Sequence, residues 1–100
     1  MNEFVRKLFS DFILALAPME DVTDTAFRRI CKSYGADMVV TEFVAAEGLL
    51  RCAEKSKKKL VFDESERPIG IQLFGNNKDS SAIAAAATKE TNPDFIDLNF

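Results

Sequence analysis

Short apolar runs alternate with amphipathic stretches along the chain. Residues 13–17 (ILALA) and 38–40 (MVV) are continuous apolar runs of strand length, which is typical of strands buried on both faces of a parallel sheet. Residues 69–74 (IGIQLF) and 94–99 (DFIDLN) also have the length and alternation of strands. The pattern therefore predicts four strands.

The stretch between the first two strands predicts an amphipathic helix. Thr23 or Asp24 can cap its start, and Gly35 ends it as a left-handed cap. Apolar side chains recur at the spacing of one helical face, and we expect that face to be buried: Phe27, Ile30, Cys31 and Tyr34. The cationic side chains between them are expected to face solvent: Arg28, Arg29 and Lys32.

Two further helices separate the remaining strands. Residues 46–60 predict a helix with Leu49, Leu50 and Ala53 inward and the lysine-rich residues 55–59 mostly outward. Such lysines favour the negative end of a helix dipole, and contact with a phosphate backbone is the alternative. Residues 63–66 are expected to be an exposed connection, and the alanine-rich residues 80–91 predict the third helix.

The alternation of strands and helices favours a parallel α/β sheet with right-handed crossovers. A flavodoxin-like sheet and part of a TIM (β/α)8 barrel both fit this order. A closed barrel needs about 250 residues, so a chain of 100 residues supplies half of one. Because the chain stops one residue after its fourth strand, we expect residues 1–100 to be the N-terminal half of a longer, truncated barrel domain.

Composition limits the chemistry. The chain is 47% hydrophobic and 29% charged, with a net charge of −3, which argues against disorder and against a globally basic nucleic-acid binder. It has no histidine, and Cys31 and Cys52 lack the spacing of a metal site, so no metal is expected. Both cysteines are expected to be buried in a protein of the reducing cytoplasm. The apolar run at residues 12–17 is too short to span a membrane.

Polar residues stand at the carboxyl ends of the predicted strands, where parallel α/β folds bind ligands. These are Pro18-Met19, Thr41-Glu42, Gln72 and Asn99. Gln72 shares a strand face with Gly70 and Phe74, and its amide offers the donors and the acceptor that a heterocyclic imide edge requires. A core glutamine bonded to neighbouring backbone is the alternative. Asp97 is expected to pair structurally, and Glu42 to act as an acid or base or in a capping or ion-pair role.

Four segments together resemble the tRNA-dihydrouridine synthases. Residues 17–28 (APMEDVTDTAFR) resemble the N-terminal signature of that family, except that Asp21 stands where glycine is frequent. Residues 35–37 with 41–44 (GAD, TEFV), residues 67–68 with 72–75 (RP, QLFG) and residues 94–99 (DFIDLN) resemble its second, third and fourth strands. The resemblance covers the chain from about residue 12 onward.

This resemblance implies an FMN-dependent flavoprotein on a TIM barrel, an oxidoreductase of tRNA processing in the cytoplasm. In the family, reduced flavin passes hydride to C6 of a uracil flipped out of tRNA, a cysteine protonates C5 to give dihydrouridine, and NADPH restores the reduced flavin. The backbone of Pro18, Met19 and Glu20 would line the flavin ring, Gln72 would bind its pyrimidine edge, and Asn99 would border flavin and uracil. The family's cysteine would follow Phe100, so no catalytic residue is expected within the chain.

A self-contained, non-catalytic flavodoxin-like or receiver-like binding domain is the competing interpretation. Glu20 and Asp21 fit the acidic cluster of a receiver after its first strand, whereas Gln72 and its neighbours supply no aspartate to end the third. On the barrel interpretation, the 100 residues alone are expected to be inactive and to self-associate.

Overall fold

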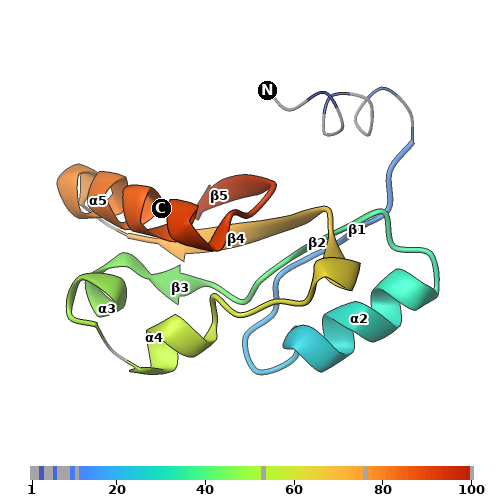
Figure 1. The fold of residues 1–100 in the computed structure, drawn as a ribbon, viewed down its shortest axis with the longest axis horizontal. Coiled ribbons are helices and arrows are strands. Elements are labelled where there is room, and N and C mark those ends of the chain that lie inside the picture. Colours follow the sequence, from blue (N-terminus) through green and yellow to red (C-terminus); the bar gives the residue numbers. More distant parts are fainter. Residues whose placement is uncertain are drawn as a thin grey trace.

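A parallel sheet of five strand segments carries the fold of the chain (Figure 1). The computed structural model describes residues 3, 6, 10, 12–52, 54–75 and 77–99. The strands are β1 (Ala15–Leu16), β2 (Met38–Val40), β3 (Val44–Ala45), β4 (Ile69–Phe74) and β5 (Phe95–Asn99). All their pairings are parallel.

The strand segments β2 and β3 pair with β4 one after the other. Val40 is the register partner of Gly70, and Val44 is the register partner of Leu73. The chain therefore advances four residues from β2 to β3 while β4 advances only three. The extra residue interrupts the ladder in the manner of a β-bulge. With β2 and β3 taken together, the order across the sheet follows the sequence, from β1 through β2 and β3 to β4 and β5. This is the predicted parallel order of part of a TIM barrel, and it differs from the flavodoxin-like order.

The core lies on the helical side of β4. Ile71 and Leu73 are buried together with Val44, Ala46 and Ala84, while Leu49, Leu60, Ala85 and Ile96 pack around them. The helices that cover them are α3 (Ala46–Leu50) and α5 (Lys78–Thr88), the latter followed by a short 3-10 helix, η2 (Lys89–Thr91). The predicted strand 69–74 is confirmed, and the third predicted helix begins two residues earlier than expected.

The first strand is shorter and less buried than predicted. Only Ala15 and Leu16 pair with β2, and Ala15 is exposed while Leu16 is half-buried. Within the described residues β1 is an edge strand, so half of its surface has no neighbour to bury it. The expectation of a strand over residues 13–17 buried on both faces is therefore wrong for this chain.

The helix α2 (Thr25–Ser33) has the predicted ends but not the predicted buried face. Asp24 accepts the Phe27 N–H at 2.8 Å as N-cap, and Gly35 has a left-handed φ of 109°. However, Ile30 and Tyr34 are 57% and 87% exposed, whereas Arg28 is 3% exposed. The spacing could not reveal this, because Arg28 is buried by a distant carboxylate, Glu66, that neutralises it.

Residues 46–60 form two short helices instead of one. After α3 the chain turns through Cys52, whose φ is 55°, and resumes as α4 (Glu54–Lys58). Cys52 and Leu50 are exposed and Cys31 is half-buried, so the expectation of two buried cysteines and an inward Leu50 is wrong. Ala53 lies outside the described residues.

The segment before β4 is also more ordered than predicted. Residues 64–66 form a 3-10 helix, η1 (Glu64–Glu66), with a capping box between Asp63 and Glu66. Glu66 is fully buried, so residues 63–66 are not simply an exposed connection. None of the helices in the described part of the chain has the length and apolarity that a membrane crossing requires.

Candidate functional site

The face of β4 opposite the core carries the candidate site. Ile71 and Leu73 point to the helices, and Gln72 therefore lies on the other face, as the alternation predicts. Three register pairs follow one another on this face toward the carboxyl ends of β4 and β5: Gly70 with Phe95, Gln72 with Asp97, and Phe74 with Asn99. Side chains stacked in such layers line the interior of a barrel.

The first layer is apolar and tightly packed. A Cβ atom on Gly70 would lie 2.1 Å from the nearest ring atom of Phe95, so only glycine leaves space for this aromatic ring. The ring therefore closes the amino-terminal side of the Gln72–Asp97 layer. Phe74 and Asn99, in the third layer, are exposed at the carboxyl ends.

The second layer is a polar pair. Gln72 Nε2 donates to Asp97 Oδ2 at 2.7 Å, and both side chains are half-buried. The backbone N–H of Gln72 donates to Thr41 Oγ1 at 3.2 Å. The partner of the amide is thus a carboxylate and not neighbouring backbone, and the predicted structural pairing of Asp97 is confirmed. Among the described residues, Gln72 Oε1 accepts no hydrogen bond.

An ion pair at the other end of these strands fixes their register. Arg67, which precedes β4, contacts Asp94 Oδ1 at 3.2 Å and donates to Asn92 O at 2.8 Å. Asp94 Oδ2 in turn accepts the Ile69 N–H at 2.8 Å. The hydrogen bond to Glu64 raises the pKa of the Arg67 guanidinium, and the pKa of Asp63 is lowered chiefly by the Ser65 hydroxyl. Asp63 and Glu64 both lie in the segment that leads into β4.

The loop after β1 is held by Thr23. Its hydroxyl accepts the Met19 N–H at 2.9 Å and lies 3.2 Å from the Met19 carbonyl, which also accepts the Thr23 N–H at 3.0 Å. Pro18 is half-buried, whereas Met19 and Glu20 are exposed. Pro18 has no N–H and that of Met19 is engaged. Of the three predicted flavin contacts in this loop, only Glu20 keeps a backbone N–H without a partner among the described residues.

Sequence reasoning missed the role of Lys59 beside this loop. Its ammonium lies 2.9 Å from Glu20 Oε1 and 5.0 Å from the centre of the Phe43 ring, and its side chain is 16% exposed. The lysine therefore holds Glu20 and does not extend into solvent with its neighbours. Nothing in the run of lysines at residues 55–59 distinguishes this one before the fold is known.

Glu42 accepts a hydrogen bond from the backbone of the loop after β1, which is a structural contact of the kind that the sequence left as one alternative. Its Oε1 accepts the backbone N–H of Asp21 at 2.5 Å. Asp21 has a φ of 62°, in the left-handed region that favours glycine. Carboxylate oxygens of Glu20, Asp21 and Glu42 lie within 4.8 Å of one another, but Lys59 and the Asp21 N–H already engage two of these groups.

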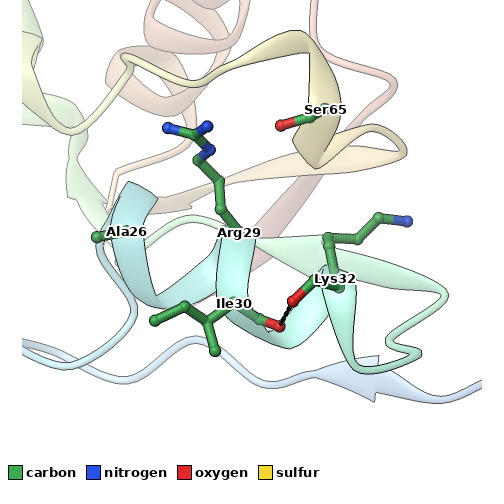
Figure 2. A pocket seen from close by; sticks show the side chains of 6 residues that line it. Ala26, Arg29, Ile30, Lys32 and Ser65 are labelled. Atoms are coloured by element: carbon green, nitrogen blue, oxygen red, sulfur yellow. Dashed lines mark hydrogen bonds between the residues drawn. The ribbon is translucent and has the colours of Figure 1, made fainter.

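A separate surface pocket of about 610 Å³ lies beside α2. Figure 2 shows the Arg29 side chain extending from the helix on the side of Ser65, and the Lys32 side chain also extending away from the helix. Ser33, which also lines the pocket, donates its hydroxyl to Ile30 O at 2.7 Å. None of the predicted site residues lines this pocket, so it is distinct from the candidate site on the sheet.

A parallel α/β sheet of the TIM-barrel type, with polar side chains at the carboxyl ends of its strands, is the architecture of a barrel enzyme. Comparison with protein families identifies the family to which the chain belongs. Residues 15–100 match the family described as dihydrouridine synthase, and the chain belongs to this family. The predicted resemblance is thereby confirmed.

Curated relatives agree with this family. The chain is 49% identical to a probable tRNA-dihydrouridine synthase of Aquifex aeolicus over 86 residues, which are 85% of this chain and 27% of the relative. It is 38% identical to tRNA-dihydrouridine synthase B of Pseudomonas aeruginosa (86% of this chain, 26% of the relative) and 36% identical to a probable tRNA-dihydrouridine synthase of Rickettsia prowazekii (85% and 26%). The chain spans about a quarter of the length of these relatives.

Proposed function

We propose that the chain forms the N-terminal part of an FMN-binding barrel enzyme that reduces uridine in tRNA to 5,6-dihydrouridine in the cytoplasm. The family and its relatives support an oxidoreductase that modifies tRNA. The observation that carries the proposal further is the Gln72–Asp97 pair on the open face of the sheet. The sequence-ordered strands favour this function over a flavodoxin-like or receiver-like domain.

The chemistry of the donor set fits a flavin ring. An ionised carboxylate only accepts hydrogen bonds, so Asp97 requires the NH₂ group of Gln72 to face it. This leaves Gln72 Oε1 and the second N–H of the amide for the imide edge of a ring, which offers one N–H donor between two carbonyl acceptors. The exposed amide of Asn99, two residues beyond Asp97 on the same strand face, would border both the flavin and the uracil.

The loop after β1 would supply the remaining contacts. Because Thr23 engages both polar backbone groups of Met19, the Glu20 N–H is the donor that this loop offers to the ring, and the side chain of Met19 offers apolar surface. When bound, FMN reduced by NADPH supplies the hydride. We expect the proton donor to lie outside residues 1–100, since Cys31 is in α2 and Cys52 is in the turn between α3 and α4.

Reconstitution of the complete enzyme tests this function. The purified protein should show the visible absorbance of stoichiometric FMN and, with NADPH, should add two hydrogen atoms to a uridine of unmodified tRNA, detected by mass spectrometry of the nucleosides. The Ser33→Ala variant, which changes a hydroxyl bonded only within α2, serves as a matched control and should retain both properties. A well-folded protein that binds no flavin and leaves tRNA unchanged would contradict the proposal.

A further inference from the structure

A buried ion pair lies between α2 and the segment that leads into β4. Arg28 Nε lies 2.5 Å from Glu66 Oε1, and the two side chains are 3% and 0% exposed. Glu66 Oε2 also accepts the Thr25 hydroxyl at 2.6 Å and the Asp63 N–H at 2.7 Å. Every buried side-chain nitrogen or oxygen in the described part of the chain has a partner, so the network is complete.

Stability alone is a weak reason for such a pair. Removing two charges from water costs as much as their attraction returns, and apolar residues of similar volume often replace a buried pair without loss. The segments that the ion pair joins offer a better reason for it. Both of its ends lead to segments of the candidate site.

One end reaches the loop after β1. Arg28 Nη1 donates to the Thr23 carbonyl at 2.8 Å. Thr23 is fully buried and binds both the N–H and the carbonyl of Met19. A chain of hydrogen bonds thus runs from the guanidinium to the backbone of Met19.

The other end reaches β4. Glu66 is the last residue of η1, and Arg67 follows it directly and binds Asp94, the residue before β5. Through this short connection the position of Glu66 determines where β4 begins, and β4 carries Gln72 six positions further on. The same carboxylate therefore ties the Met19 loop to the strand of Gln72.

We propose that Arg28 and Glu66 are positioning residues: their buried pair sets the conformation of the Met19 loop and its place relative to β4, and so pre-organises the two segments that meet the flavin ring. This inference rests on the proposed function for its effect on FMN, while its effect on the loop is independent of any ligand. Pre-organised contacts bind more tightly because less conformational freedom is lost on binding.

Three variants of the complete enzyme separate positioning from stability. Arg28→Lys keeps the positive charge but loses the planar guanidinium, whose separate N–H groups donate to Glu66 and to Thr23 at the same time. Glu66→Gln keeps the shape and removes the charge. The double variant Arg28→Met/Glu66→Leu replaces the pair with apolar side chains, which should recover thermal stability relative to the single variants but cannot bind the Thr23 carbonyl.

The readouts are the thermal midpoint, the FMN dissociation constant at a temperature where all variants are folded, the visible circular dichroism of bound FMN, and hydrogen exchange of the Met19 amide. We expect all three variants to raise the dissociation constant by roughly tenfold or more, to change the dichroism, and to exchange the Met19 amide faster. Thr88→Val, which alters a buried hydroxyl bonded only within α5, should lower the midpoint and leave the other readouts unchanged.

Unchanged exchange at Met19 in the single variants would overturn the inference. So would a double variant that binds FMN as the parent protein does. If the parent protein binds no FMN, the proposed function fails, and the exchange of the Met19 amide still decides whether the pair holds the loop.

Discussion

Asp97 on β5 holds the side-chain amide of its register partner, Gln72 on β4, through a hydrogen bond of 2.7 Å. The two residues come from neighbouring parallel strands and share the face away from the helical core. Asp97 can only accept, so it determines which way the amide of Gln72 faces. The aspartate therefore orients the side chain that we propose binds the flavin ring.

Substituting Gln72 should therefore weaken FMN binding in the complete enzyme more than it weakens the fold. Gln72→Ala removes the amide from the imide edge, at a cost of roughly 1–3 kcal/mol in binding. It also leaves Asp97 half-buried without its partner, so a smaller loss of stability is expected. Titration of the apoprotein with FMN, together with thermal unfolding, measures both, and unchanged flavin affinity would show that Gln72 is only structural.

The left-handed backbone at Asp21 predicts a difference between glycine and alanine. Asp21→Ala should destabilise the chain by about 1 kcal/mol relative to Asp21→Gly, because an L-residue with a side chain is strained at a φ of 62°. Both variants keep the backbone N–H that donates to Glu42, so the comparison isolates the effect of the backbone conformation. Urea unfolding measures the difference, and equal stabilities of the two variants would exclude strain at this position.

The Ser65 hydroxyl is the largest cause of the lowered pKa of Asp63. A carboxyl whose pKa is lower in the folded state stabilises the fold above its unfolded pKa, and this contribution is lost as the pH falls through the folded pKa. Ser65→Ala should therefore move the pKa of Asp63 up toward its ordinary value and make stability less dependent on pH in the acid range. The backbone N–H of Ser65 still donates to Asp63 in this variant, so the pKa of Asp63 should return only part of the way to its ordinary value.

Titration of the Asp63 carboxyl by NMR checks this prediction. The control is Ser33→Ala, whose hydroxyl bonds only to Ile30 O within α2. A pKa that moves equally in both variants, or in neither, would contradict the assignment of the cause to Ser65.

The sequence was sufficient for the parallel order and for the face of Gln72, because alternation within a strand and short connections are local properties. It was insufficient where a contact joins distant residues. Arg28 looked like a surface residue because its partner, Glu66, lies 38 positions away, and Lys59 looked like one of several solvated lysines. The break at Cys52 within an apparently continuous helix was also hidden, since no proline or glycine marks it.

The exposed side of α2 leads to the last prediction, that the isolated 100-residue chain associates with itself. Phe27, Ile30 and Tyr34 recur at the spacing of one helical face and are all exposed, and this apolar strip belongs to the helix that contacts β2. Beyond β2 the sheet ends at β1, which has only β2 as a partner among the described residues. Open strand edges next to apolar surface favour association between chains. Ile30 and Tyr34 are mostly exposed and lie outside the core cluster, so charged residues should be tolerated at these two positions.

Sedimentation velocity of the isolated chain should show dimers or larger species, and the double variant Ile30→Glu/Tyr34→Lys should sediment mainly as a monomer. Ile83 on α5 is exposed to the same extent as Ile30, at 57%, and therefore provides the matched control Ile83→Glu. Because the main contacts of α5 are with α3, β4 and η2, this control leaves the α2 face unchanged and should still associate. A parent chain that is monomeric at all concentrations, or a control that dissociates as completely as the double variant, would show that the α2 face does not drive association.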